Sequence, residues 1–278
     1  MSLFISSLNS GSNGNCYYIG NDEEAVLIDA GISCRETEKR MKRLGLQIEK
    51  VRAIFVSHEH SDHITGVVQL AKKYQVPVYI TCVTRTGSRL LLQEHLAVSF
   101  AAYHPVTIGG LTITAFPKNH DACDPHSFIV SSSSVTVGIF TDIGMACDQV
   151  IRYFQQCHAA FLESNYDAGM LQNGNYPYYL KKRITGGKGH LSNSQALSLF
   201  LTHRPPFMTH LLLSHLSKNN NCPKLVQELF NQYALDTQII VASRYEETPV
   251  YQVTAIQPPE VVPKQLFHQP KQLQLSLF

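Results

Sequence analysis

The sequence predicts a mixed α/β domain, and three observations lead to that prediction. Its 278 residues are 44% hydrophobic and 16% charged, a balance that suits a packed core rather than a disordered chain. Short apolar segments rich in β-branched residues alternate with segments of helical periodicity. A histidine-rich segment follows directly after the apolar segment at residues 51–57, which predicts a functional loop at the end of a buried strand.

The predicted elements follow one another along the chain with turn residues between them. Glycine and asparagine at residues 9–15 indicate a tight turn between the first two strands. Ser192 and Gln195 form a capping-box pattern that opens a helix, and Pro223 suits the first turn of another. We predict strands at residues 3–8, 16–19, 24–29, 51–57, 76–81, 111–116, 127–132, 135–141, 161–163, 210–214 and 238–242, and helices at residues 34–45, 64–74, 146–156, 192–202 and 222–233.

The composition changes near the end of the chain. Residues 255–274 are dominated by Gln, Pro, Val and Lys, which is typical of an extended segment. We therefore predict one folded domain at residues 1–254 and an extended tail at residues 255–278.

Charge and cysteine usage exclude several classes of protein. The net charge of +2 does not by itself indicate a nucleic-acid-binding protein. The seven cysteines are odd in number and form no C-x-x-C pair, so neither a disulfide framework nor a thiolate zinc site is expected. We see no signal peptide and no apolar run approaching the roughly 18 residues of a membrane span. A cytoplasmic protein without membrane contact is the expectation.

The strongest functional signal is the segment Ser57-His-Glu-His-Ser-Asp-His63. Alternate residues of an extended segment point to the same side, so His58, His60 and Asp62 can converge, and His63 can join them from the other side. Imidazole and carboxylate groups are suitable ligands for zinc or manganese. A polar surface turn is the alternative, but it explains three histidines and an aspartate within six residues poorly.

The spacing H-x-H-x-D-H after a buried strand resembles the signature of the metallo-β-lactamase superfamily. The resemblance covers residues 3–250 and implies a four-layer αββα sandwich with two divalent metal ions, zinc or manganese, at one edge of the sheets. It also implies three later ligands, with one metal held by His58, His60 and His120, the other by Asp62, His63 and His215, and Asp142 shared between them. Taken singly, each later residue could be an ordinary buried histidine or turn aspartate, and His126 competes with His120.

Within this superfamily, Glu163 and His190 resemble a pair in the phosphodiesterase branch, as in ribonuclease Z. There a glutamate supports a histidine that protonates the leaving oxygen, which is sensible chemistry for an alkoxide leaving group. The alternative is a histidine at a helix start beside an unrelated glutamate. The resemblance thus implies a catalytic group of Glu163, His190 and Asp62.

Three short segments resemble the YycJ/WalJ family of bacterial exonucleases: residues 10–15, 189–193 and 215–220. This resemblance implies a DNA exonuclease acting from the 5′ end, linked in some members to DNA repair. The tyrosines and cations before His190 suit stacked bases and phosphates, although a solvated helix face would look similar. The residues expected to bind substrate are Ser10, Ser12, Asn13, Lys181, Lys182, Arg183, Lys188, Ser192, Asn219 and Asn220.

The last five residues resemble the peptide by which bacterial proteins bind the DNA polymerase sliding clamp. Leu277 and Phe278 would enter an apolar groove, with Gln274 and Leu275 beside them. A frayed tail or a strand packed on its own domain is the alternative. The clamp is therefore an expected partner, together with DNA.

Three other functions stay open at this point. An RNA-processing nuclease would use the same metals and the same acid, and would differ in substrate because only RNA has 2′-hydroxyl groups. A thioesterase or lactonase would not need Glu163 and His190. A non-enzymatic adaptor bound to the clamp would require a defective metal site, and all seven expected ligands are present.

Overall fold

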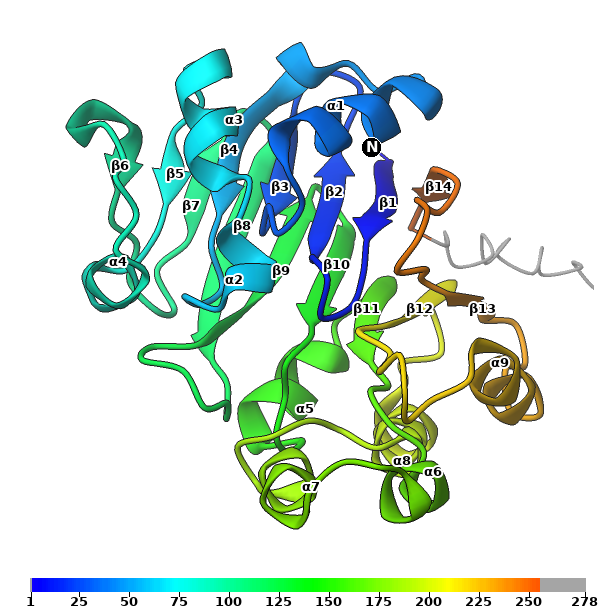
Figure 1. Ribbon diagram of the computed structural model, residues 1–278. Coiled ribbons are helices and arrows are strands. Elements are labelled where there is room, and N and C mark those ends of the chain that lie inside the picture. Colours follow the sequence, from blue (N-terminus) through cyan, green and yellow to red (C-terminus); the bar gives the residue numbers. More distant parts are fainter. Residues whose placement is uncertain (1, 256–278) are drawn as a thin grey trace, which may run out of the picture.

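Two β-sheets pack face to face and carry helices on their outer faces, as the computed structural model shows for residues 2–255 (Figure 1). The first sheet has the strand order β14-β1-β2-β3-β4-β5-β6. Its strands are β1 (Leu3–Asn9), β2 (Cys16–Gly20), β3 (Ala25–Ile28), β4 (Val51–Phe55), β5 (Val78–Tyr79), β6 (Ala97–Val98) and β14 (Tyr251–Val253). Strands β3 to β6 run parallel, whereas β14, β1, β2 and β3 pair antiparallel.

The second sheet has the strand order β13-β12-β11-β10-β9-β8-β7. Its strands are β7 (Val106–Ile108), β8 (Leu111–Pro117), β9 (His126–Ser132), β10 (Val135–Phe140), β11 (Ala159–Glu163), β12 (His210–Ser214) and β13 (Gln238–Val241). Strands β10 to β13 are parallel, and β7 to β10 are antiparallel. Consequently β8, β10, β11 and β12 all point their carboxyl ends toward the same edge.

The helices form the outer layers. They are α1 (Cys34–Arg43), α2 (Ser61–Ile64), α3 (Val67–Tyr74), α4 (Cys82–Ser88), α5 (Asp148–Phe154), α6 (Ala168–Asn173), α7 (Tyr178–Thr185), α8 (Asn193–His203) and α9 (Pro223–Asn231), with 3₁₀ turns at Ile48–Lys50 and Glu94–Leu96. Apolar residues of α1 and α3 pack on the first sheet, and those of α5, α8 and α9 pack on the second. The predicted αββα sandwich is confirmed.

The central core consists of apolar side chains from the facing surfaces of both sheets. Phe55 of the first sheet stacks on Tyr79 with ring centroids 4.5 Å apart and meets the edge of Phe128 in the second sheet at 5.8 Å. Burying such a ring stabilises the fold by about 1.5–3 kcal/mol. The two sheets are thereby held rigidly enough to support a site at their common edge.

Several predicted boundaries differ from the structure. The strand expected at residues 76–81 is reduced to Val78–Tyr79. The helix expected at residues 64–74 begins at Val67, as α3, because the preceding short helix α2 already ends at Ile64. The predicted capping box is present, with the Ser192 hydroxyl accepting from the Gln195 amide. The tail prediction for residues 255–278 lies almost entirely outside the described residues.

Candidate metal centre and active site

The predicted metal ligands lie where strands end at one edge of the sandwich. The loop from His58 to His63 leaves β4, and His120 follows β8. Asp142 comes two residues after the end of β10, and His215 directly follows β12. Because the carboxyl ends of β8, β10 and β12 share an edge, these residues meet although they are far apart in the sequence.

The first group of donor atoms is formed by His58, His60 and His120. The His58 Nε2 and His60 Nδ1 atoms are 3.1 Å apart, close to the separation of about 3.3 Å expected for two nitrogens on one tetrahedral zinc ion. The His120 Nδ1–H donates to the Gly189 carbonyl at 3.1 Å, which fixes the ring. The His120 Nε2 atom is buried and has no hydrogen-bond partner among residues 2–255, as expected for a nitrogen whose partner is a metal.

The second group is formed by Asp62, His63 and His215. The Asp62 Oδ2 atom lies 3.6 Å from His63 Nε2 and 3.4 Å from His215 Nε2. The His63 ring is fully buried, whereas the Asp62 side chain retains 19% of its exposure. This group therefore faces solvent on its Asp62 side.

Asp142 lies between the two groups. Its carboxylate oxygens are 3.1 Å from His63 Nε2, 3.4 Å from His215 Nε2 and 3.9 Å from His120 Nε2. Asp142 and His215 have φ angles of 53° and 56°, the left-handed region that residues other than glycine rarely adopt. Such backbone strain is common at functional sites, where the surrounding structure imposes it.

The protonation states of the candidate ligands differ between the two groups. Burial lowers the pKa of His58 well below its usual value and lowers that of His120 to about 4, so both imidazoles are neutral at pH 7. Burial would raise the pKa of Asp142, but His215 and His63 lower it well below the usual range. Burial would lower the pKa of His63 and His215, but Asp142 and other nearby carboxylates raise it, to about 10 for His63. Divalent ions bind neutral imidazoles and carboxylates, so the donor set fits two ions if His63 and His215 each release a proton when the metal binds.

Asp29 is a functional residue that the sequence interpretation missed. Its buried carboxylate accepts from the Ser57 amide and hydroxyl, both at 2.7 Å, and lies 2.6 Å from His63 Nδ1. With Nδ1–H facing Asp29, the Nε2 atom of His63 is left as the donor toward the metal centre. The sequence signal for Asp29 was its position directly after a buried strand. In the structure Asp29 also has a positive φ of 60°.

The sequence interpretation also did not include Lys118 among the residues of the site. It is 6% exposed, and its ammonium group donates to the Thr141 carbonyl at 2.7 Å. Burial lowers its pKa, whereas Asp142, Asp29 and Glu163 favour the charged form. Lys118 thus supplies a buried positive charge behind a cluster of carboxylates.

The predicted pair of Glu163 and His190 is in contact beside the metal ligands. The His190 Nδ1–H donates to Glu163 Oε1 at 2.7 Å, while Glu163 Oε2 accepts from the Ile143 and Leu191 amides. Burial would raise the pKa of Glu163, but His190 lowers it to about 2. Glu163 is therefore a carboxylate at neutral pH. It also lies 3.2 Å from His215 Nδ1, so one carboxylate supports both histidines.

Three of the residues expected to bind substrate are buried in the framework. Ser10 accepts from the His215 amide at 2.8 Å and contacts the Tyr17 hydroxyl. Ser192 caps α8, and Asn220 is 1% exposed. All three side chains are nearly inaccessible, at 1–4% exposure, and their expected contact with a substrate stays a prediction.

The other expected substrate residues are at least partly exposed around the site. Asn13 donates to the Arg244 carbonyl, Lys181 to the Gln172 carbonyl, and Asn219 to the Tyr176 hydroxyl. Arg183 forms an ion pair with Asp121, next to His120. The remaining members of this group are Ser12, Lys182 and Lys188.

Comparisons with known proteins identify the family of this chain. The family model of the metallo-β-lactamase superfamily matches residues 10–82. The exodeoxyribonuclease YycJ of Bacillus anthracis is 34% identical over 254 residues, which cover 88% of this chain and 94% of the relative. The chain belongs to the YycJ/WalJ branch of the metallo-β-lactamase superfamily. The exodeoxyribonuclease WalJ of Streptococcus pneumoniae is 31% identical over 82% of the chain and 87% of its own length.

Membership of the metallo-β-lactamase superfamily makes this protein a metal-dependent hydrolase. The metallo-β-lactamase-fold protein YhfI of Bacillus subtilis shares the fold with a TM-score of 0.70 at 18% identity, over 91% of this chain and 100% of its own. His126, the competitor of His120, lies outside the ligand groups of the described residues and packs against Phe100.

Other expectations concern the chain as a whole. All seven cysteines are free, which agrees with the predicted absence of disulfides. Among residues 2–255, no helix has the length and apolar character needed to cross a membrane.

Proposed function

We propose that this protein is a two-metal phosphodiesterase that degrades DNA from the 5′ end. The contact between Glu163 and His190, 2.7 Å long and beside both ligand groups, carries the proposal. A thioester hydrolase has no need of such an acid, because a thiolate departs without a proton. The names of the YycJ and WalJ relatives support DNA as the substrate.

The residues around the centre have distinct roles in this proposal. His58, His60 and His120 would hold one divalent ion, Asp62, His63 and His215 the other, and Asp142 both. Two such ions, zinc or manganese, supply an activated water and neutralise charge on a phosphate. The nitrogen and oxygen donors suit either metal.

His190 is the proposed general acid. Its Nδ1–H is held by the Glu163 carboxylate, which orients the ring and leaves Nε2–H for the departing oxygen. Since the His190 side chain is 18% exposed, a substrate can reach it. Asp62, also partly exposed, would act in catalysis as well as in metal binding.

The cations near α7 would bind the phosphate backbone. Lys182 and Lys188 are exposed, and Arg183 is anchored by Asp121. Ser12, Asn13 and Asn219 would contribute weaker polar contacts from neighbouring loops. Phosphate contacts of this kind position a nucleic acid without reading its sequence.

We also propose a role in DNA repair or replication through the sliding clamp. The residues concerned are Gln274, Leu275, Leu277 and Phe278, all outside the described part of the chain. They would follow a hydrolase domain at residues 1–254. Deleting residues 274–278 should abolish clamp binding in a pull-down with purified clamp while leaving nuclease activity unchanged; unchanged binding would refute the idea.

The direct test of the function uses duplex DNA labelled at either end, with manganese or zinc and with a chelator control. Wild-type protein should release nucleotides from the 5′ end, and His63→Ala should not. His104→Ala, which changes an exposed histidine away from the ligand groups, is the matched control. Cleavage of RNA but not DNA would instead favour the ribonuclease alternative, and full activity in His63→Ala would refute the metal-site assignment.

A further inference from the structure

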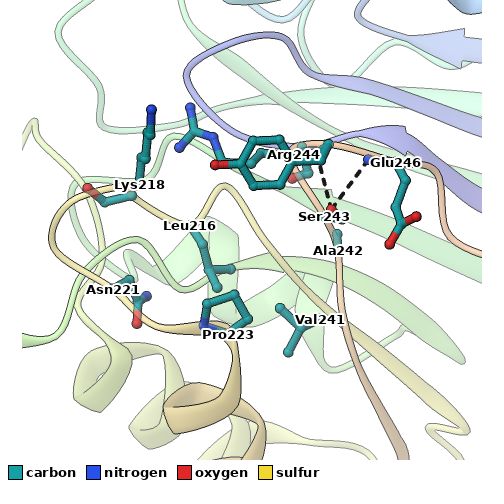
Figure 2. A pocket seen from close by; sticks show the side chains of 12 residues that line it. Leu216, Lys218, Asn221, Pro223, Val241, Ala242, Ser243, Arg244 and Glu246 are labelled. Atoms are coloured by element: carbon teal, nitrogen blue, oxygen red, sulfur yellow. Dashed lines mark hydrogen bonds between the residues drawn. The ribbon is translucent and has the colours of Figure 1, made fainter.

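A largely apolar pocket of about 340 Å³ adjoins the metal centre on its His215 side. Three segments far apart in the sequence form it: Ser10, the loop between β12 and α9 with Pro223 at the start of α9, and residues 241–246 from the end of β13 onward (Figure 2). Its volume lies at the lower end of the range of about 300–1,000 Å³ that is usual for small-ligand sites. The pocket is not part of the metal centre, and the catalytic group does not use it.

The pocket is connected to the metal centre through His215. Ser10 lines the pocket, and its hydroxyl accepts from the His215 amide at 2.8 Å. Leu216 and Ser217 follow His215 directly and also line the pocket. The pocket therefore adjoins the backbone of His215, one of the candidate metal ligands.

The pocket combines an apolar floor with a cationic rim. Figure 2 shows Leu216 and Val241 on one side and the head groups of Lys218 and Arg244 on the other. The Glu246 carboxylate points away from these two cations. A flat apolar group with an adjacent phosphate matches this arrangement.

Arg244 has unused hydrogen-bonding capacity. Its Nη1 atom is buried without a hydrogen-bond partner among residues 2–255, and Nη2 contacts only the Ser12 hydroxyl, at 3.3 Å. A buried guanidinium N–H without a partner is costly, so a ligand acceptor is a natural complement. A phosphate oxygen provides that acceptor.

Tyr245 adds an exposed aromatic ring to the pocket. The residue is 70% exposed, although its carbonyl is fixed by Arg40 at 2.9 Å. Every nucleobase has a face that can stack on such a ring, whatever the DNA sequence. The combination of Tyr245, the apolar floor and the two cations therefore favours a nucleotide over a peptide or a lipid.

We propose that this pocket binds the nucleobase of the nucleotide adjoining the scissile phosphate, with Lys218 and Arg244 on the flanking phosphate. The proposal rests on the proposed nuclease function and adds a base-binding subsite to it. Stacking on Tyr245 is independent of base identity, which suits an enzyme that removes successive nucleotides.

The test compares duplex DNAs whose first or second nucleotide carries a normal base or is abasic. For the wild-type protein, removal of the base at one of these two nucleotides should raise KM about tenfold. In Tyr245→Ala the KM values for normal and abasic DNA should become equal, whereas the control Tyr233→Ala, another exposed tyrosine, should keep the difference. Equal KM values in the wild type, or an unchanged difference in Tyr245→Ala, would overturn the proposal.

A binding measurement separates this proposal from the nuclease function. If the wild type cleaves none of these DNAs, the proposed function fails, and binding then decides the role of the pocket. The fluorescence of 2-aminopurine deoxyriboside 5′-monophosphate should be quenched by the wild-type protein, with at least fivefold weaker affinity in Tyr245→Ala. Absence of quenching would overturn the pocket assignment.

Discussion

At the scale of single residues, the proposed metal ligands are held in place by a surrounding layer of protein groups. Asp29 holds His63, the Gly189 carbonyl holds His120, and Glu163 holds His215. Each contact engages the Nδ1 atom of the histidine, so that its Nε2 atom faces the proposed metal centre. Partners of this kind orient ligands and usually change metal affinity by about 10–100-fold when they are removed.

Asp29→Asn tests this supporting layer. The substitution retains the shape of the side chain but removes the charge that faces His63 Nδ1, so we expect metal affinity to fall by about 10–100-fold. Competition with a chromophoric chelator would measure it. Asp236→Asn, at an exposed position, is the control. Unchanged affinity in Asp29→Asn would show that His63 needs no carboxylate partner.

The sequence predicted the ligands better than their partners. The spacing of His58, His60, Asp62 and His63 is visible within six residues, and the structure brings these together with the three later candidates. Asp29 is different because its partner lies 34 positions away, and an aspartate after a strand looks like an ordinary turn residue. Lys118 was missed for a similar reason: only the folded structure buries it among carboxylates.

At the scale of the elements, the loop from His58 to His63, called the metal loop below, depends on close backbone packing just after β3. The Gly31 amide donates to the Asn15 carbonyl at 2.8 Å, and the Asn15 amide donates to the Asp62 carbonyl at 2.7 Å. The turn after β1 and the metal loop are thereby locked together. A Cβ atom on Gly31 would lie 1.7 Å from the Asp62 carbonyl oxygen.

Gly31→Ala should therefore displace the metal loop. We expect the free energy of unfolding to fall by about 1–3 kcal/mol, as is usual for overpacking, and the metal affinity to fall with it. Urea denaturation and chelator competition would measure the two effects. Gly187→Ala is the control, because its Cβ would meet only the Met145 sulfur, at 4.0 Å. A stable Gly31→Ala protein with normal metal binding would contradict this account.

Most elements with a clear apolar pattern were predicted, whereas strands β6, β7 and β14 and helices α4, α6 and α7 were not. Strands such as β1 and β12 have clear apolar patterns, and α8 has its capping box. Strands β6 and β14 have only two or three residues, too few to establish a period of two. Their extended form comes from pairing with β5 and β1, which periodicity cannot reveal.

At the scale of the whole molecule, the metal centre connects the two sheets. His58, His60, Asp62 and His63 follow a strand of the first sheet, whereas His120, Asp142 and His215 follow strands of the second. Bound ions would therefore cross-link the sandwich at one edge. Binding to the folded state alone adds about 2.7 kcal/mol of stability when the metal is present at 100 times its Kd.

Chelation should consequently lower the melting temperature of the wild-type protein. We expect a decrease of about 5–10 °C, since each kcal/mol corresponds to about 2–4 °C in a domain of this size. Differential scanning calorimetry with and without a chelator would measure it. Asp142→Asn should show a smaller chelator effect because the shared ligand is weakened. A melting temperature that does not respond to chelator in the wild type would contradict the cross-link.

The order of the strands in the two sheets could not be obtained from the local pattern. Pairing of β13 with β12 or of β14 with β1 joins segments whose periodicity carries no information about partners. The resemblance to the superfamily supplied the αββα arrangement, and the structure agrees with it. The nucleotide pocket was not predicted, because its three segments come together only through this strand order.

The central claim is that His190 protonates the leaving oxygen of a phosphodiester at a two-metal centre. The most direct measurement compares normal DNA with DNA in which sulfur replaces the leaving oxygen of the terminal linkage, because a thiolate leaves without a proton. His190→Ala should slow cleavage of normal DNA by about 10²–10⁴-fold and leave cleavage of the sulfur substrate nearly unchanged. Equal slowing of both substrates would show that His190 is not the general acid.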